Sequence, residues 1–236
     1  MKSLLDDRFV PLTHQIGFLE GNFETIVDVY LRWQRSLHGE VSSDVLNAPL
    51  AAALQRLEPL TTPWEKELFI ATNSRWVAYF NNGLRVSDPE SPIGHLATIV
   101  PCRGLVVACA PDRSHVTARD ALRIYGAVSF TMLVAHQTDW LNLERAICAM
   151  NDGGRWVFLE QGILQAFERP EKYKARRIRD RFSPEMLEEY CAALDIRVFD
   201  ETFYGGKTLI ARRPKQIGPR SPAMSLQEAR RLTLLR

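Results

Sequence analysis

The sequence predicts an α+β fold made of two related ββαββ-like modules, which form a mainly antiparallel sheet with helices packed on it. One observation is a repeated hairpin signature, in which an Ala-x-Asn turn leads into an Arg-Trp-Val strand. Another is that a Ser-Pro helix start and a Tyr-Gly before a final strand follow in the same order in both halves. The cues are Arg75-Trp76-Val77 and Arg155-Trp156-Val157, Ser91-Pro92 and Ser183-Pro184, and Tyr125-Gly126 and Tyr204-Gly205. Their offsets of 80, 92 and 79 residues favour an internal duplication.

The bulk composition is that of an ordinary globular protein. The 236 residues can bury a sizeable core, and 46% of them are hydrophobic and 25% charged. No apolar run approaches the roughly 20 residues that span a bilayer. Asp6 and Asp7 lie where a signal peptide would have its apolar core, so we expect a cytoplasmic protein with no membrane segment. The four cysteines include no Cys-x-x-Cys pair and lie among apolar residues, which indicates reduced, buried thiols.

An N-terminal helical hairpin is predicted over residues 1–60. Residues 18–37 place apolar side chains on one face and charged side chains on the other, which is typical of an amphipathic helix. A second helix is predicted to begin near Asn47, with Pro49 in its first turn, and to end before Pro59. The two helices are expected to cover the modules that follow.

The first module is predicted over residues 64–136. Its strands are expected at four places, which are 68–72, 76–80, 105–108 and 128–135. The first two flank Asn73-Ser74, which predicts a hairpin turn. A short helix is expected to begin at Ser91, because serine is a favoured N-cap and Pro92 is tolerated at the first helical position.

The second module, residues 138–213, is predicted to repeat this order. Hairpin strands are expected at 145–150 and 155–160 around an Asn-Asp-Gly-Gly turn. A helix is expected to begin at Ser183, and strands are expected at 196–199 and 208–211.

The residues that follow, 214–236, are predicted to form a basic C-terminal tail. Residues 212–236 carry seven Arg and Lys against one acid, a net charge of +6, which leaves −4 for the rest of the chain. The prolines and glycine at its start are typical of a linker. The last 13 residues could form a short amphipathic helix that docks on the body, meets a partner, or frays.

The second half carries a basic insertion that the first half lacks. The offset between the Ser-Pro cues is longer than the other two, and the excess falls within residues 169–182. Seven Arg and Lys accompany two acids within 169–181, a net charge of +5. We predict a basic helical insertion that could grip phosphates or a partner's carboxylates through charge-assisted hydrogen bonds. The alternative is a solvated helix whose arginines pair locally with Glu168, Glu171, Asp180, Glu185 or Glu188.

The leading functional interpretation is a non-catalytic cytoplasmic binding protein, comparable to an immunity protein or an adaptor, whose partner is another protein. The predicted binding residues combine the insertion with the second Arg-Trp-Val strand: Tyr173, Lys174, Arg176, Arg177, Arg181 and Arg155. Tyr173 and Phe182 are expected to hold the insertion to the core, although Tyr173 could instead stack on a base.

Two other functions fit the same residues. An enzyme or a binder of an anionic small molecule would use a cleft between the modules, lined by Arg155, Glu160, Glu168 and Arg177. A nucleic-acid-binding protein would show an affinity that falls steeply with salt. A deep pocket of converging Arg, Glu and His side chains would favour the enzyme, and a shallow surface would favour the interaction protein.

No motif for catalysis, metal binding or nucleotide binding is present. The five histidines lack zinc spacing, so we expect no metal and no cofactor. His95 and Cys102 would act as a Cys–His pair only if the fold brought them within hydrogen-bond reach.

The two Arg-Trp-Val strands suggest a further possibility. Because side chains alternate between the two faces of a strand, Trp76 and Trp156 are predicted to point into the core and to anchor equivalent strands. Arg75 and Arg155 would then lie on the other face, where they could form a symmetric pair of cations near a pseudo-two-fold axis.

The stretch from Asp152-Gly153-Gly154-Arg155-Trp156-Val157-Phe158 through Arg179-Asp180-Arg181-Phe182 resembles conserved hypothetical bacterial proteins that have no assigned activity. Because that group carries no assigned mechanism, the resemblance implies no catalytic residues.

Overall fold

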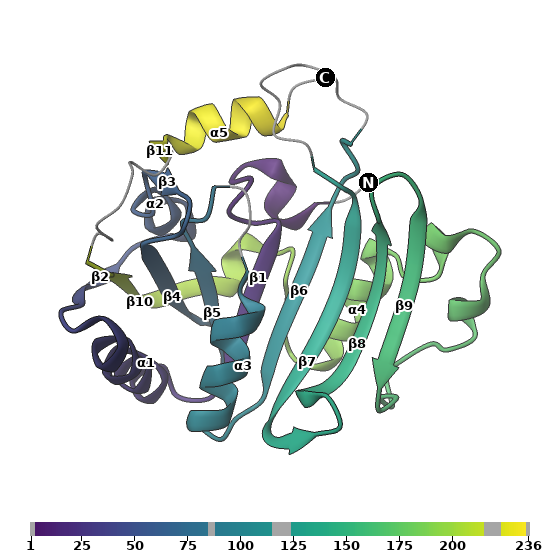
Figure 1. Ribbon diagram of the computed structural model, residues 1–236, viewed down its shortest axis with the longest axis horizontal. Coiled ribbons are helices and arrows are strands. Elements are labelled where there is room, and N and C mark those ends of the chain that lie inside the picture. Colours follow the sequence, from purple (N-terminus) through teal and green to yellow (C-terminus); the bar gives the residue numbers. More distant parts are fainter. Residues whose placement is uncertain (1–2, 85–87, 115–123, 215–222, 235–236) are drawn as a thin grey trace.

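A nine-stranded sheet forms the centre of the fold (Figure 1). The computed structural model describes residues 3–84, 88–114, 124–214 and 223–234. The strand order is β2-β10-β4-β5-β1-β6-β7-β8-β9, and each neighbouring pair is antiparallel. The predicted α+β class, with a mainly antiparallel sheet and helices packed on it, is therefore confirmed.

The elements of the described ranges have the following bounds. The strands are β1 (Gln15–Glu20), β2 (Ser42–Asn47), β3 (Leu60–Thr61), β4 (Lys66–Thr72), β5 (Trp76–Asn81), β6 (Gly104–Ala110), β7 (Ala127–Thr138), β8 (Leu141–Asn151), β9 (Trp156–Gly162), β10 (Tyr204–Arg212) and β11 (Ala223–Met224). The α-helices are α1 (Phe23–His38), α2 (Leu50–Gln55), α3 (Glu90–Ile99), α4 (Pro184–Ala193) and α5 (Leu226–Thr233). The 3-10 turns are η1 (Leu4–Asp7), η2 (Lys172–Lys174), η3 (Ile178–Asp180) and η4 (Glu201–Phe203).

Strand β1 lies in the middle of the sheet, between β5 and β6. Because β5 and β6 are both antiparallel to β1, they run parallel to each other, and α3 lies on the connection that crosses β1. Two glycines allow α3 to approach the sheet closely. A Cβ at Gly17 would lie 2.6 Å from Ile93 Cγ1, and a Cβ at Gly104 would lie 2.7 Å from Ile93 Cγ2.

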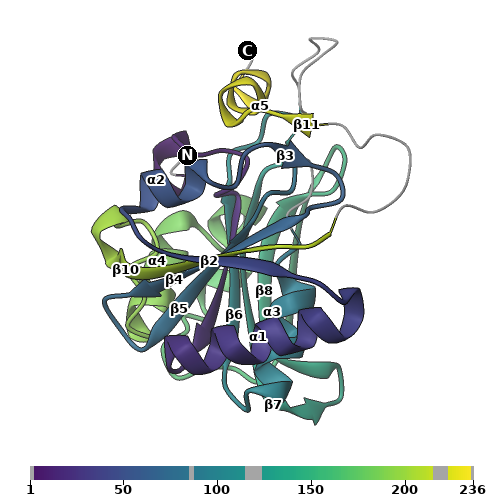
Figure 2. The ribbon, with the colours of Figure 1, turned by 90° about the vertical axis from the view of Figure 1, so that its left-hand side faces the viewer.

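Helices cover both faces of the sheet and create two hydrophobic clusters (Figure 2). On one face α1 and α3 pack against the strands, and the Tyr30 ring of α1 lies 4.6 Å from the Phe69 ring of β4. On the other face α2, α4 and α5 pack against them, and the cluster there includes Leu187 and Phe130. We refer to these as the α3 face and the α4 face.

Helix α4 begins where the sequence predicts, whereas α1 begins at Phe23 rather than at residue 18, because residues 15–20 form β1. Helix α3 begins at Glu90, one residue before the predicted start, and Pro89 rather than Ser91 is its N-cap. Helix α1 begins after Asn22, whose side chain accepts a hydrogen bond of 3.0 Å from the backbone N–H of Thr25. Helix α4 begins after Ser183, whose hydroxyl accepts a hydrogen bond of 3.4 Å from the N–H of Met186. In both cases the capping side chain satisfies a backbone donor that the helix itself leaves free.

Both predicted hairpins are present. Strands β4 and β5 flank Asn73-Ser74, and β8 and β9 flank a turn in which Gly153 and Gly154 have φ values of 70° and 149°. Glycine adopts these positive φ values without the steric cost that a side chain brings. The strands predicted at 105–108, 128–135 and 208–211 correspond to β6, β7 and β10.

The predicted N-terminal helical hairpin is not confirmed. The turn η1 and the central strand β1 precede α1, and β2 separates α1 from α2. The two ββαββ-like modules are not confirmed either, because β10 of the second module pairs with β4 of the first and with β2. The domain boundaries at 1–60, 64–136, 138–213 and 214–236 stay predictions.

The strand predicted at 196–199 is wrong. This segment is a turn that follows α4, although Ile196 and Val198 are buried in it. Their alternation is typical of a strand, but no neighbouring strand pairs with them among the described residues. Packing against the core, rather than a ladder of backbone hydrogen bonds, explains the apolar pattern.

The described part of the tail docks on the body. Leu226, Ala229 and Leu232 of α5 are buried, β11 pairs with β3, and the N–H of Leu226 donates to Glu58 Oε1 at 2.6 Å. Helix α5 thus closes one end of the α4 face. Among the described residues, no helix has the length and apolar character needed to cross a membrane.

Candidate functional site

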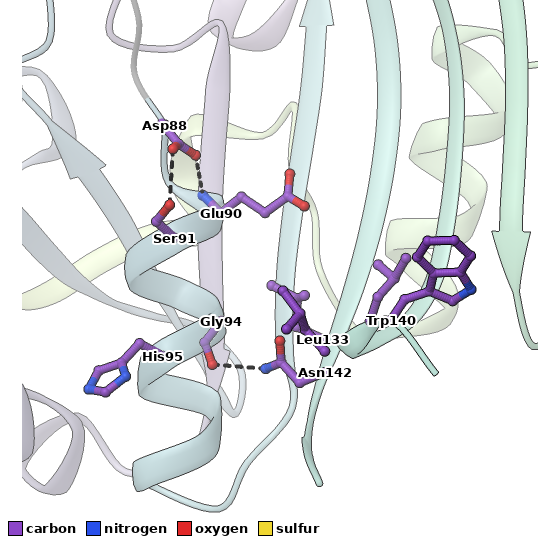
Figure 3. A pocket seen from close by; sticks show the side chains of 10 residues that line it. Asp88, Glu90, Ser91, Gly94, His95, Leu133, Trp140 and Asn142 are labelled. Carbon is purple, nitrogen blue, oxygen red and sulfur yellow. Dashed lines mark hydrogen bonds between the residues drawn. The ribbon is translucent and has the colours of Figure 1, made fainter. Parts of the chain in front are cut away.

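A hollow of about 600 Å³ lies between α3 and the turn that joins β7 to β8 (Figure 3). Part of its polar lining, at Asp88 and Asn142, is engaged within the protein. Asp88 accepts hydrogen bonds from the N–H of Glu90 and the hydroxyl of Ser91, both at 3.1 Å. Asn142 Nδ2 donates to the backbone oxygens of Gly94 and Val134, at 2.9 and 3.1 Å. None of the residues predicted from the sequence to bind a partner lines this hollow.

The predicted basic insertion lies elsewhere, next to β9, and it is not a helix. Residues 169–182 contain only the short 3-10 turns η2 and η3, with extended backbone at Ala175 between them (φ −55°, ψ 143°). A continuous helix would place like charges four residues apart at Lys172 and Arg176 and at Arg177 and Arg181, which destabilises a helix. The helical form of the insertion was therefore a wrong prediction, and we call residues 169–182 the basic segment.

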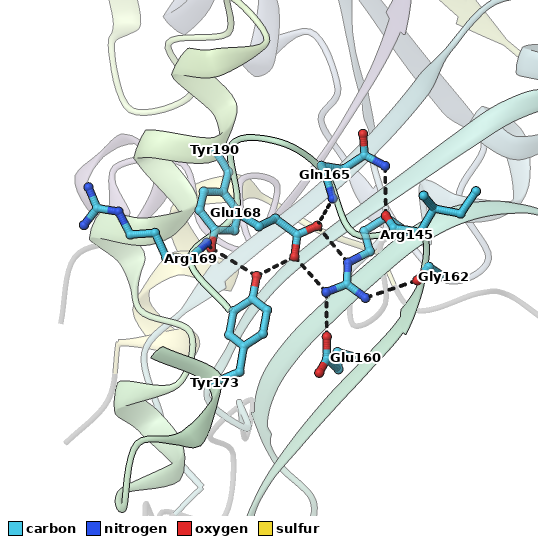
Figure 4. A network of polar contacts seen from close by, with 9 residues as sticks. Arg145, Glu160, Gly162, Gln165, Glu168, Arg169, Tyr173 and Tyr190 are labelled. Atoms are coloured by element: carbon cyan, nitrogen blue, oxygen red, sulfur yellow. Dashed lines mark hydrogen bonds and ion pairs between the residues drawn. The ribbon is translucent and has the colours of Figure 1, made fainter. Parts of the chain in front are cut away.

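A buried network of polar contacts anchors the basic segment to β8 (Figure 4). Arg145 binds Glu168 through two hydrogen bonds of 2.8 and 2.7 Å, and it binds Glu160 at 2.6 Å. The Tyr173 hydroxyl donates to Glu168 at 2.7 Å and lies 3.0 Å from the Tyr190 hydroxyl. The side chains of Arg145 and Glu168 are 3% and 0% exposed. This paired geometry offsets the cost of burying both charges.

The network holds its members in fixed protonation states. Burial alone would lower the pKa of Arg145, but hydrogen bonds to Glu168 and Glu160 outweigh burial and raise that pKa above its usual value. Burial raises the pKa of Tyr173, and hydrogen bonds to Tyr190 and Glu168 raise it further. Arg145 therefore stays charged and Tyr173 stays protonated, which suits a structural anchor better than a group that exchanges protons.

Two arginines of the basic segment lie on aromatic side chains of β9. The Arg179 guanidinium is 4.3 Å from the centre of the Trp156 ring, and the Arg181 guanidinium is 5.8 Å from that of Phe158. Arg181 Nε also donates to the Ala175 oxygen at 2.9 Å. These contacts press the segment onto the α4 face of β9.

The remaining predicted cations point into solvent. Arg155, Lys174, Arg176 and Arg177 are exposed, and no hydrogen bond or ion pair joins their side chains to another described residue. We call these four residues the basic surface. Their charges have no counter-ion within the part of the chain that the structure describes.

The structure thus separates the predicted site residues into two groups. Tyr173 and Arg181 belong to the packing of the segment, because Tyr173 is 5% exposed and Arg181 is half-buried. The cleft predicted for an anionic small molecule is not formed as expected, since Glu160 and Glu168 are paired with Arg145 while Arg155 and Arg177 are exposed. Base stacking by Tyr173 is excluded by its burial.

Arg145 is the residue that the sequence interpretation missed. A signal was present, because Arg145, Ile147 and Ala149 alternate along one strand and the latter two are buried. A charged residue in such a core-facing register requires a buried partner. Only the fold shows that the partner is Glu168.

The symmetric cation pair at Arg75 and Arg155 was also a wrong prediction. Strands β5 and β9 are separated by β1, β6, β7 and β8, and Arg75 forms an ion pair with Glu20 at 3.0 Å. The two tryptophans differ as well. Trp76 is buried and donates to the Leu194 oxygen at 2.8 Å, whereas Trp156 is half-buried.

The described residues give no sign of a metal or thiol centre. No cluster of three or more His, Cys, Asp or Glu side chains in them could hold a metal ion. The four cysteines are free thiols. Burial raises the pKa of Cys102 to about 11, and the His95 ring packs 4.3 Å from the Trp33 ring. A protonated Cys102 is a weak nucleophile, so the Cys–His pair gains no support.

Comparison with known proteins does not identify a family for this chain. No protein-family model, no curated protein and no solved structure matches this chain with significant similarity.

Proposed function

We propose that the protein is a non-catalytic cytoplasmic binding protein that recognises an acidic partner protein through its basic surface. The main support for this proposal is that Arg155, Lys174, Arg176 and Arg177 are exposed and have no counter-ion among the described residues. Several other exposed arginines are paired, such as Arg32 with Asp28 at 2.9 Å and Arg169 with Glu189 at 2.9 Å. Exposed cations without counter-ions steer and orient a partner of opposite charge.

The anchored basic segment supports this proposal. The buried network around Glu168 and the two guanidinium–ring contacts fix the backbone that carries Lys174, Arg176 and Arg177. A surface that is already ordered loses less conformational entropy when a partner binds. The segment therefore combines an anchored backbone with exposed charged side chains.

A protein partner fits the surface better than a nucleic acid. Binding to single strands relies on exposed aromatic rings that stack with bases. Tyr173 and Phe182, the aromatic residues of the basic segment, are 5% and 0% exposed. Because these rings are buried, the basic segment exposes cations but neither of these two rings is available for a base to stack on.

The test compares the wild-type chain with Arg176→Glu/Arg177→Glu. Each tagged protein is used to capture partners from a lysate of the native host, and the captured proteins are identified by mass spectrometry. The identified partner is then purified and titrated. We expect the double variant to lose capture and to weaken binding by about a hundredfold, since charge reversal replaces attraction by repulsion at two positions.

A matched control is Arg32→Glu/Arg35→Glu, which makes the same charge change on the exposed side of α1. This control should retain the partner. Equal capture by the wild-type chain and the folded Arg176→Glu/Arg177→Glu variant would remove the proposal. If the control variant also loses the partner, the loss of binding is caused by the change in net charge rather than by the basic surface.

A further inference from the structure

Strand β9 forms an edge of the sheet whose backbone groups are unpaired. The N–H of Ile163 donates to the Glu144 oxygen at 2.8 Å, so Ile163 directs its N–H toward β8. In an antiparallel ladder the pairing direction alternates along the strand. Val157, Leu159 and Gln161 therefore direct their N–H and C=O groups toward β8, in register with Met150, Cys148 and Ala146.

The intervening residues direct their backbone groups away from the sheet. These residues are Trp156, Phe158 and Glu160, and their backbone N–H and C=O groups bind no partner among the described residues. An unpaired row of this kind is a template for another strand. The printed contacts of the basic segment with β9 are made on the α4 face, where η3 lies against both β8 and β9 and its arginines contact the rings of Trp156 and Phe158.

The two faces of β9 differ in character. On the α4 face, the basic segment brings Arg179 and Arg181 next to the strand, and Lys174, Arg176 and Arg177 extend from the same segment. On the α3 face, Val157 is half-buried and Leu159 is 57% exposed. Figure 1 shows that no described helix covers β8 and β9 on this near side.

We propose that the acidic partner binds as an extended strand that pairs with the free edge of β9, with carboxylates toward the basic segment and apolar side chains toward Leu159. This inference rests on the proposed function and names the form in which the partner binds. Alternation along a strand places successive side chains on opposite faces of the sheet. The matching chemistry is therefore a segment in which acidic and apolar residues alternate. Backbone hydrogen bonds would supply affinity, and the two faces would supply specificity.

A second copy of this chain matches the edge poorly. Antiparallel pairing of two β9 strands around a two-fold axis perpendicular to the sheet would place both basic segments on the same face. Each segment has a net charge of +5 within 169–181, so the two would repel. A strand that carries carboxylates would instead be attracted to the basic segment.

The test uses a fluorescent peptide of alternating glutamate and valine, eight residues long, titrated against the purified full chain at low salt. The edge is blocked by Glu160→Pro, which removes an N–H that faces away from β8 and leaves the ladder with β8 intact. The matched control is Glu160→Ala, which removes the same ion pair with Arg145 but keeps the N–H. We expect Glu160→Pro to weaken binding by about tenfold relative to Glu160→Ala, and Arg176→Glu/Arg177→Glu to weaken it as well.

A second measurement keeps the inference testable if Glu160→Pro fails to fold. The peptide is N-methylated either at its glutamates or at its valines, which blocks one backbone edge and leaves every side chain in place. Methylation of one set should abolish binding to the wild-type chain, and methylation of the other set should leave it within about threefold.

Four outcomes would overturn edge pairing. The first is equal binding by folded Glu160→Pro and Glu160→Ala, the second is equal binding of both methylated peptides, and the third is no binding of the unmodified peptide. The fourth is a wild-type dimer that Glu160→Pro converts to a monomer, which would make a second copy the occupant. The proposed function is contradicted by a different result, in which the natural partner binds Arg176→Glu/Arg177→Glu as tightly as it binds the wild-type chain.

Discussion

Arg145 shows how one buried charge fixes a surface that lies several residues away. Its guanidinium binds both oxygens of Glu168, and Glu168 in turn accepts from Tyr173 and from the N–H of Gln165 at 2.8 Å. Each donor or acceptor in this set has a partner, which is the condition under which a buried ion pair is tolerated. The backbone at the start of the basic segment is therefore held by side chains of β8 and α4.

Replacement of Arg145 by methionine should lower the free energy of unfolding by about 3–5 kcal/mol, because the Glu168 carboxylate would remain buried without its cation. Urea unfolding followed by circular dichroism measures this loss. The double variant Arg145→Met/Glu168→Met should regain much of the stability, since no unpaired charge is left. A single variant as stable as the wild-type chain would contradict the structural role of this pair.

The burial of His14 should make the free energy of unfolding depend on pH. Burial lowers the pKa of His14 from 6.5 to about 4, with Asp7 opposing the shift and Arg113 adding to it. The unfolded chain then binds a proton below pH 6.5, while the folded chain resists protonation until about pH 4. Stability should therefore fall as the pH drops through this window, by up to about 3 kcal/mol. Urea midpoints between pH 7 and 4 measure the slope, and His14→Gln should flatten it; an unchanged slope in this variant would contradict the assignment.

At the scale of elements, the sequence predicts those whose signals are local. The hairpin around Asn73-Ser74 and the helix capped by Ser183 follow from turn and capping residues alone, and both are confirmed. The basic segment and residues 196–199 were predicted wrongly, because their apolar positions reflect packing rather than a regular backbone. Strand β1 was missed, since its six residues were divided between a loop and the start of a helix.

Strand β1 should be essential for folding, because it pairs with β5 and β6 at the centre of the sheet. A chain that begins at residue 22 would leave both neighbours with unpaired edges and would remove the buried Ile16 and Phe18. We expect this truncated chain to lose cooperative thermal unfolding, as measured by calorimetry. Addition of a synthetic peptide of residues 1–21 should restore it in part. A cooperative transition in the truncated chain alone would contradict this expectation.

At the scale of the whole molecule, the sequence predicts the class of fold but not its topology. Repeated cues around Trp76 and Trp156 predicted two modules, yet four other strands separate the strands that carry these residues, and the surroundings of the two tryptophans differ. Strand order depends on contacts between distant residues, which local periodicity does not report. The same limit applies to the site: the basic composition of residues 169–182 was visible in the sequence, whereas their anchoring through Arg145 and the free edge of β9 depend on the fold.

The position of β10 has a consequence for the growing chain on the ribosome. This strand, at residues 204–212, inserts between β2 and β4, which lie within the first 72 residues. The sheet cannot close on that side until nearly the whole chain has been synthesised, so one edge of β4 stays open throughout translation. At about 5–20 residues per second, this interval lasts on the order of ten seconds. The nascent chain therefore exposes the unpaired backbone edge of β4 to chaperones or to neighbouring chains for longer than it exposes a strand that pairs with its immediate successor on that side.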